Sequence, residues 1–332
     1  MLCRDGKPSA PGGAGFAALA GWQGGTFWHD KCMQNFMQMI VQQEVAMQLQ
    51  LYKTLWGHTG SYADAVQQAQ DAGFQGIECA VPAADADLDA LARALDGPSG
   101  HLPWIAEICT AGSYVPERCA TLVQHLDSLD DALRRCRVLA PVFVNCMGGC
   151  DAWPLARSLD FFRGAMALAD KHGLTISFET HRGRSLFNPW RSMEILDALP
   201  DLKITCDFSH WCVVAERLMD SELEAIALAA EHAHHIHARV GYDQGPQVPH
   251  PAAPEYAEAL ASHQRCWEQV WAAQRRRGYH TTTLTPEFGP DGYLHQLPFT
   301  GAPVADLWQV NTWIAATERD HFRAVQALDE AV

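Results

Sequence analysis

The sequence predicts an α/β protein built as a single (β/α)8 TIM barrel with a short N-terminal extension. The main observation is a strict alternation between short apolar, β-branched runs and longer helical stretches, repeated eight times along the chain. The alternation has no obvious reversal point, which favours closure into a barrel over an open, doubly wound sheet. The chain has 332 residues, 48% of them hydrophobic, which is ample for one barrel of about 250 residues.

The strands and helices follow from this alternation in order. The eight expected strands cover residues 49–55, 76–80, 103–109, 141–147, 174–179, 202–207, 234–239 and 281–287. The eight expected helices cover residues 61–71, 85–95, 116–139, 154–172, 190–199, 222–232, 255–277 and 306–330. We expect Ser61 to cap the first helix and Pro116 to begin the third, because these residue types are favoured at helix starts.

Residues 1–46 differ in composition from the rest of the chain. A Pro/Gly-rich stretch is followed by a Met/Gln-rich one, and the short apolar part near Phe16 makes a poor signal peptide with no clear cleavage site. Two interpretations remain open: a disordered or loosely packed extension, or a start assigned too far upstream, with Met47 as the true first residue. The second is favoured because the first expected strand follows almost at once. Residues 47–332 are then the catalytic domain.

Charge and cysteine content restrict the partners and the compartment. The formal net charge of −15 weighs against a nucleic acid or an anionic membrane as partner. No apolar run approaches the roughly 18 residues of a membrane span. The 11 cysteines are scattered and form no Cys-x-x-Cys pair, which indicates reduced thiols in a cytoplasm. Dinucleotide-binding and P-loop glycine motifs are not found.

Four consecutive expected strands carry, at or near their ends, a residue type that binds metals. These residues are Glu179, Asp207, His237 and Glu287. The carboxyl ends of barrel strands converge on one mouth, where three carboxylates would repel one another unless a cation lay between them. Three oxygen ligands and one imidazole suit Mn²⁺, Mg²⁺ or Co²⁺ and also allow Zn²⁺. A single Glu at a strand end is usually a solvated or paired loop residue. Four potential ligands on successive strands, however, favour a site for one divalent metal ion.

Five short motifs make the chain resemble a known family. They are Gly-Ile-Glu at 76–78, Phe-Glu-Thr-His at 178–181, Cys-Asp-Phe-Ser-His at 206–210, His-Ile-His at 235–237 and Pro-Glu-Phe-Gly at 286–289. Through them, residues 48–325 resemble the xylose isomerase-like TIM-barrel superfamily of sugar phosphate isomerases and epimerases. That superfamily includes ketose 3-epimerases, inosose dehydratase and endonuclease IV.

The resemblance implies roles for individual residues. It implies that Glu179, Asp207, His237 and Glu287 hold one divalent metal ion. It also implies that Glu179 and Glu287 are the catalytic acid/base pair on either face of the substrate, and that His210 contacts the substrate. Homo-oligomers are common in the family, so a homo-oligomer is an expectation from the resemblance alone.

The segments around the ligand set supply further candidates. The predicted substrate-binding residues are His210, Arg239, His181, Arg184, Trp56 and Tyr242. Arg239 follows His237 by two residues, whereas the epimerases have an arginine several residues after the metal histidine. The arginines could bind a carboxylate or phosphate, so an acidic or phosphorylated sugar is one option. The aromatic residues could stack on a sugar ring, although aromatics near barrel strands more often belong to the core.

These observations predict a cytoplasmic, metal-dependent enzyme that acts on a sugar, keto-sugar or sugar acid. The expected reaction is isomerisation or epimerisation, by proton abstraction next to a carbonyl through a metal-held enediolate. Loss of a β-hydroxyl from the same intermediate would make the chain a dehydratase or lyase, similar to inosose dehydratase. An endonuclease IV-like phosphodiesterase is a weaker alternative, and a sugar-binding barrel without catalysis remains if the site takes no metal. The expected partner is a small sugar derivative, with no nucleic acid and no membrane.

Overall fold

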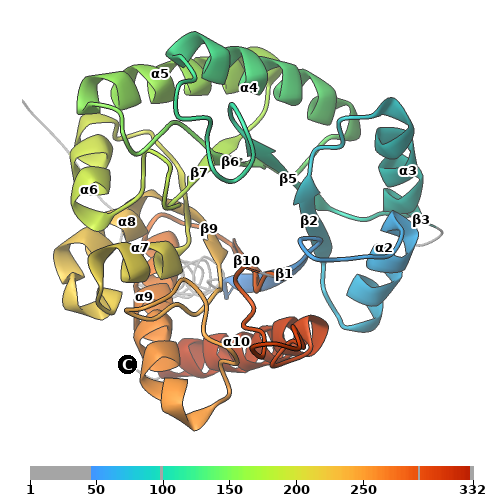
Figure 1. Cartoon of the computed structure of the whole chain (residues 1–332), viewed down its shortest axis with the longest axis vertical. Helices are drawn as coiled ribbons and strands as arrows, with labels where there is room; N and C mark the ends of the chain where they lie inside the picture. Colours follow the sequence, from blue (N-terminus) through green and yellow to red (C-terminus); the bar gives the residue numbers. More distant parts are fainter. Residues whose placement is uncertain (1–45, 98–99, 291, 330–332) are drawn as a thin grey trace, which may run out of the picture. The chain divides into compact units, whose positions relative to one another are not determined.

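A computed structural model describes residues 46–97, 100–290 and 292–329, and these residues form a closed parallel barrel surrounded by helices (Figure 1). Neighbouring strands follow the order β1-β10-β9-β8-β7-β6-β5-β2 around the barrel. The barrel strands are β1 (Gln48–Thr54), β2 (Gly76–Ala80), β5 (Trp104–Cys109), β6 (Val144–Met147), β7 (Ile176–Glu179), β8 (Ile204–Cys206), β9 (Ala233–His237) and β10 (Thr281–Thr285). The predicted fold is therefore confirmed. The predicted extension lies outside the described residues, apart from Ala46.

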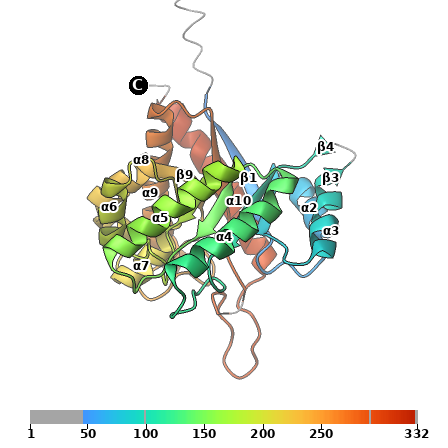
Figure 2. The same cartoon turned by 90° about the horizontal axis from the view of Figure 1, so that it is seen from above.

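The helices pack around the outside of the strands (Figure 1). They are α2 (Tyr62–Asp71), α3 (Asp85–Leu95), α4 (Leu122–Cys136), α5 (Leu155–His172), α6 (Pro189–Ala198), α7 (Phe208–Ala215), α8 (Leu223–His232), α9 (Ala257–Arg276) and α10 (Leu307–Asp329), with short 3-10 turns at Arg137–Leu139, Met219–Ser221 and Pro254–Tyr256. A small antiparallel pair, β3 (Asp96–Gly97) and β4 (Gly100–His101), lies beside α3 (Figure 2). No helix in the described part of the chain is long and apolar enough to cross a membrane.

Local hydrogen bonds explain which helix starts were predicted correctly. Ser61 caps α2 as expected, since its hydroxyl accepts from the Asp64 N–H while the Asp64 carboxylate accepts from the Ser61 N–H. The expected helix start at Pro116 is wrong. Thr121 caps α4 instead, through the same reciprocal pair with Gln124, and Pro116 lies in the loop before it.

Helix α7 was not predicted and lies directly after β8. Asp207 is its N-cap residue, and the Asp207 carboxylate accepts a hydrogen bond from the Ser209 N–H. Strand β8 therefore ends one residue earlier than expected, at Cys206. Strands β9 and β10 also end two residues early, so Arg239 and Glu287 lie just beyond the strands rather than inside them.

The interior of the barrel is polar above an apolar base. Tyr52, Ile105 and Phe143 form a small apolar cluster separate from the main core between strands and helices. Elsewhere in the interior, hydrogen bonds join side chains of adjacent strands, such as Ser177 Oγ to Thr205 Oγ1 at 2.9 Å. The barrel thus carries a layer of buried polar groups beneath its mouth.

Candidate metal centre

The four predicted ligands come together at the mouth of the barrel. Glu179 and His237 are the last residues of β7 and β9, while Asp207 and Glu287 follow β8 and β10 by one and two residues. One ligand atom from each residue lies within 4.8 Å of the others, and all four side chains are buried. The barrel register thus assembles the whole set that the strand ends suggested.

Neighbouring polar groups hold two of the carboxylates, those of Glu179 and Asp207, in place. The Asn145 side-chain amide, on β6, donates to Glu179 Oε2 at 2.9 Å. Asp207 Oδ1 accepts from the backbone N–H of Ser209 at 3.0 Å, and the Asp207 N–H donates to the Thr180 hydroxyl at 2.8 Å. Each carboxylate is therefore oriented by the strand or helix next to it.

Two buried atoms of the set face each other without a hydrogen bond. His237 Nδ1 lies 3.0 Å from Glu287 Oε2 and 3.6 Å from Glu179 Oε2. Neither His237 Nδ1 nor Glu287 Oε2 has a hydrogen bond of good geometry, although both are buried. Buried polar atoms are rarely left unsatisfied, and a positive charge between them would satisfy both.

The electrostatics of the set show the same need for positive charge. Burial raises the pKa of Glu179 well above its usual value, and the nearby Glu287 and Asp207 raise it further against the opposing effect of His237. Burial also raises the pKa of Asp207. Burial alone would lower the pKa of His237, but Glu287, Glu78 and Glu179 surround it and raise its pKa well above its usual value. The metal-free site therefore favours protonation, as expected of crowded carboxylates.

The donor set fits a divalent metal ion. Carboxylate oxygens with one imidazole suit Mg²⁺, Mn²⁺, Co²⁺ and Zn²⁺, and a cation replaces the protons that the crowded groups otherwise retain. Two further groups of three residues have the same potential: Glu78 with His235 and His237, and Glu179 with His181 and His210. Both share a residue with the four-residue set, so they surround one centre.

Arg239 reaches the ligand set from just beyond β9. Its guanidinium forms an ion pair with Asp207 and lies 3.5 Å from Glu287 Oε2, while its Nε donates to the Ser209 hydroxyl at 3.0 Å. The guanidinium carbon is 5.5 Å from the Trp56 ring centroid and 4.9 Å from that of Tyr293. Arg239 thus neutralises part of the carboxylate charge between two aromatic walls.

Two histidines stack beside this arginine. The ring centroids of His181 and His210 are 3.9 Å apart, and His210 Nε2 lies 2.6 Å from the Arg239 Nη2 and 3.7 Å from Asp207 Oδ2. Burial lowers the pKa of both histidines well below its usual value, and Arg239 adds to the effect. Both imidazoles are therefore neutral, and one nitrogen of each already has a partner: Arg239 for His210 Nε2 and the Arg182 carbonyl for His181 Nδ1.

Two of the predicted substrate-binding residues have other partners. Arg184 is fully buried and donates to the carbonyls of Thr110 at 2.7 Å, Tyr114 at 3.2 Å and Gly149 at 3.3 Å, and also to that of Ser113. Its guanidinium holds neighbouring loops together, so we do not propose it as an anion-binding group.

Tyr242 lies in the loop after β9, where its ring is 5.7 Å from that of Tyr256 and its backbone pairs with Gly245. Its described contacts belong to that loop and not to the ligand set. We therefore leave Tyr242 out of the proposed substrate site.

Several residues at the centre received no role from the sequence. Tyr293 contacts Arg239, Arg182 and Trp56, and it comes from the loop after the Pro-Glu-Phe-Gly motif, which has no local signal. Glu78 and Glu107 are carboxylates inside strands, and a charge within an apolar strand is the signal that could have found them. Burial raises the pKa of Glu107 to about 8, helped by Glu287 and Glu78. Burial would also raise the pKa of Glu78, but the adjacent His237 and His235 hold it well below its usual value.

A cavity of about 880 Å³ opens over the carboxyl ends of β1, β2 and β5. Its lining includes Trp56, His58, Arg93 and Glu107. Trp56 also adjoins the ligand set, because its ring packs on Gly289, where an added Cβ would lie only 2.1 Å from the ring. The size is within the range of about 300–1,000 Å³ that is usual for small-molecule sites.

Known structures share this architecture. The chain superposes on a D-psicose 3-epimerase with 15% identity and a TM-score of 0.53, covering 81% of this chain and 98% of the other. The values for 3-keto-D-glucoside 4-epimerase from E. coli are 13% identity, a TM-score of 0.51, and 84% and 100% coverage. For endonuclease IV from Thermus thermophilus the identity is 17% and the TM-score is 0.50, with 83% of this chain and 99% of the other covered. At these identities the likeness shows the fold alone.

No curated protein matches the sequence. The sequence pattern of the xylose isomerase-like TIM barrel, however, matches residues 66–276, which is more than half of the chain. The match runs from α2 to the end of α9 and includes three of the four ligand residues. The chain therefore belongs to the xylose isomerase-like TIM-barrel family.

Proposed function

We propose that this chain is a metal-dependent sugar isomerase or epimerase that moves a proton at a carbon next to a carbonyl. The observation that carries the proposal is the buried set of Glu179, Asp207, His237 and Glu287, whose ligand atoms lie within 4.8 Å of one another. Two of the similar structures are sugar epimerases, which agrees with the proposal at the level of the fold.

The same four residues would hold one divalent ion. His237 Nδ1 and Glu287 Oε2 favour this role most clearly, because they face each other while buried and without hydrogen bonds. A divalent ion bound there would supply Lewis-acid polarisation of a substrate carbonyl. The donor types do not choose among Mn²⁺, Mg²⁺, Co²⁺ and Zn²⁺.

Glu179 and Glu287 would carry the proton. They reach the centre from β7 and β10, with β8 and β9 between them, so each can serve a different face of a bound sugar. One carboxylate takes a proton from carbon, and the other returns a different proton, which it has drawn from solvent. Return to the neighbouring carbon gives isomerisation, and return to the same carbon from the opposite face gives epimerisation.

Neutral and aromatic groups would bind the rest of the sugar. His181 and His210 offer imidazole nitrogens beside the carboxylates, and Trp56 offers a ring face between the ligand set and the cavity. Arg239 would orient the carboxylates and bind a substrate oxygen. This combination of hydrogen-bonding groups and an aromatic wall suits a polyhydroxylated ligand.

The proposal places the enzyme in the cytoplasm. All nine cysteines in the described residues are free, and seven of them are buried. Unpaired thiols suit a reducing compartment.

Solvent-proton exchange tests the reaction directly. The full chain is incubated in D₂O with Mn²⁺, Mg²⁺ or Co²⁺ and a panel of ketoses, keto-glycosides and sugar acids, and NMR follows deuterium at the carbon next to the carbonyl. We expect exchange for one sugar class, together with a new epimer or isomer, and loss of both in Glu287→Gln.

Other outcomes would contradict this proposal in different ways. Formation of an unsaturated product with loss of water would identify a dehydratase on the same site. Cleavage of an abasic-site oligonucleotide, without sugar exchange, would identify a phosphodiesterase. Sugar binding without exchange under any metal would leave a binding protein.

A further inference from the structure

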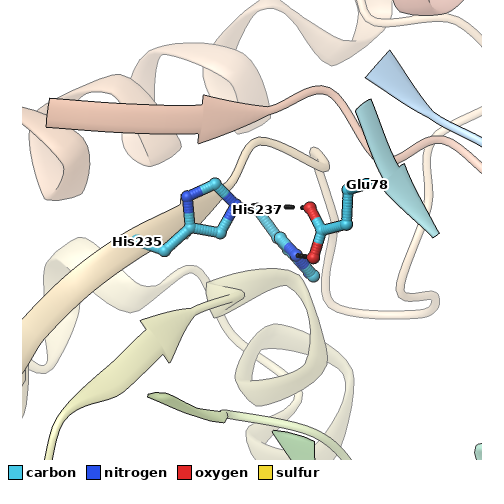
Figure 3. Close-up of side chains that lie close together, drawn as sticks. All are labelled: Glu78, His235 and His237. Atoms are coloured by element: carbon cyan, nitrogen blue, oxygen red, sulfur yellow. Dashed lines mark hydrogen bonds and ion pairs between the residues drawn. The ribbon is translucent and has the colours of Figure 1, made fainter. Parts of the chain in front are cut away.

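A buried carboxylate below the ligand set contacts two histidines at once. Glu78, the third residue of β2, is only 1% exposed. Its Oε1 lies 3.0 Å from His237 Nε2 and its Oε2 lies 3.4 Å from His235 Nε2, so each carboxylate oxygen faces a different imidazole (Figure 3). Strand β2 thereby contacts β9 across the interior of the barrel.

His235 is held in place by hydroxyl groups of the neighbouring strand, β10. Its Nδ1 lies 2.7 Å from the Thr283 hydroxyl and its Nε2 lies 3.1 Å from the Thr285 hydroxyl. The Phe143 ring packs below it, with ring centroids 5.2 Å apart. The His235 ring therefore has a fixed position beside Glu78.

The two nitrogens of His237 have different partners. Nε2 faces Glu78 Oε1 at 3.0 Å, with the Asn145 amide nitrogen farther away at 3.5 Å, whereas Nδ1 faces Glu287 and Glu179 at 3.0 and 3.6 Å. A carboxylate accepts hydrogen bonds, so Glu78 requires the proton of a neutral His237 to sit on Nε2. The lone pair then sits on Nδ1 and points into the ligand set.

We propose that Glu78 is the positioning residue of this centre: it fixes the Nε2–H tautomer and the ring angle of His237, so that Nδ1 is the metal-binding atom. This inference rests on the metal site of the proposed function. Glu78 acts through His237 and does not touch the substrate. Carboxylates that orient a ligand histidine in this way usually contribute about 10–100-fold to metal affinity.

Metal titration of the full chain tests this role without relying on activity. Calorimetry with Mn²⁺ is compared for the wild type, Glu78→Gln and Glu78→Leu, and melting of each metal-free protein is recorded in parallel. Glutamine keeps an acceptor but loses the charge, whereas leucine removes the acceptor. We expect Kd to rise about 10-fold in Glu78→Gln and about 100-fold in Glu78→Leu, with one site retained.

A buried glutamate elsewhere provides the matched control. Glu318, on α10, is also fully buried and accepts from the Gln264 side chain at 2.9 Å, but it contacts neither histidine. Glu318→Gln should leave the Mn²⁺ affinity unchanged. If the Glu78 variants only lower the melting temperature and bind Mn²⁺ as the wild type does, Glu78 is merely structural and the inference is overturned.

The imidazole tautomer gives a second readout if a variant does not fold. Nitrogen-15 NMR of the Mg²⁺-loaded wild type, assigned with His237→Gln, should show His237 protonated at Nε2. Protonation at Nδ1 would overturn the inference.

The wild-type titration separates this inference from the proposed function. If the wild type binds no Mn²⁺, both the proposed metal site and the inference are wrong. If the wild type and all variants bind one ion with equal affinity, the metal site stands and only the inference is wrong. Two ions, one of them lost in Glu78→Leu, would make Glu78 a ligand and also overturn its positioning role.

Discussion

The two halves of the barrel mouth have different contents. Strands β7 to β10 bring four potential ligands together in a small buried space, while β1, β2 and β5 carry the cavity of about 880 Å³. The charged half is defined by residues at strand ends, and the open half by loops and by helices α2 and α3. We infer a division of labour, in which one half performs the chemistry and the other accommodates the substrate.

Two glutamates of the open half show how neighbours decide charge. Glu78 and Glu107 lie on adjacent strands, β2 and β5, near the same cluster. The pKa of Glu107 rises to about 8 because His237 and Arg239 only partly offset burial and the other carboxylates, whereas His237 and His235 keep the pKa of Glu78 well below its usual value. Burial alone therefore does not fix the protonation state of a carboxylate, because hydrogen bonds and charges in direct contact can reverse its effect.

The largest effect should come from the charged half. Glu287→Gln keeps the shape of the side chain but removes a proton carrier, so kcat should fall by about 10²–10⁴-fold. Steady-state kinetics on the sugar found by solvent exchange would measure it. Glu318→Gln serves as the control and should keep normal kcat, and a loss of less than tenfold in Glu287→Gln would argue against a catalytic role.

Removal of the buried Arg239 guanidinium should have the next largest effect. Arg239→Met leaves Asp207 and Glu287 without their guanidinium partner, and breaking a buried ion pair usually costs about 3–5 kcal/mol. Urea unfolding of the metal-free protein should show this loss. Saturating Mn²⁺ should recover part of it, because the ion also compensates the carboxylates. Equal stability of variant and wild type would mean that Arg239 does not balance the charge.

The sequence predicted the charged half far better than the open half. A strand that ends in Glu179 can be recognised locally, because the apolar run stops at the functional side chain, and barrel closure then brings the strand ends together. Asp207 was recognised as a ligand candidate, but its second role as the N-cap of α7 was missed, because the helix follows the strand with no connecting turn.

The remaining site residues depend on contacts between distant segments. Tyr293 reaches Arg239 from a loop after β10, and the Arg184 guanidinium is occupied by carbonyls of residues around 110–114 and 149. Neither arrangement leaves a periodic or motif signal in the local sequence. The role of Glu78 depends on histidines 157 and 159 positions later, which only the closed barrel brings near it.

The protonation of Glu107 predicts a pH effect on stability. Its folded pKa, about 8, lies above the unfolded value of 4.5, so the folded state retains a proton that the unfolded state has lost. Stability from this group is present below pH 4.5 and decreases as the pH rises toward 8, by at most about 1.4 kcal/mol per pH unit. Glu107→Gln should flatten this dependence in denaturant titrations of the metal-free protein. A slope equal to that of the wild type would show that Glu107 ionises freely.

Filling the cavity should have the smallest effect and should change binding alone. Ala90 lies on α3 and lines the cavity, so Ala90→Phe should raise KM about tenfold, which is about 1.4 kcal/mol, with kcat nearly unchanged. Ala227→Phe, on the exposed surface of α8, is the matched control. If Ala90→Phe leaves KM unchanged, the open half does not hold the substrate and the proposed division of labour is wrong.

Metal content tests the single four-residue centre most directly. The purified full chain is loaded with Mn²⁺, dialysed and analysed for metal per chain, beside a Glu179→Gln/Glu287→Gln double variant. We expect about one divalent ion per wild-type chain and a large loss in the variant. A wild type that retains no ion after loading, or that retains three, would contradict the single four-ligand centre.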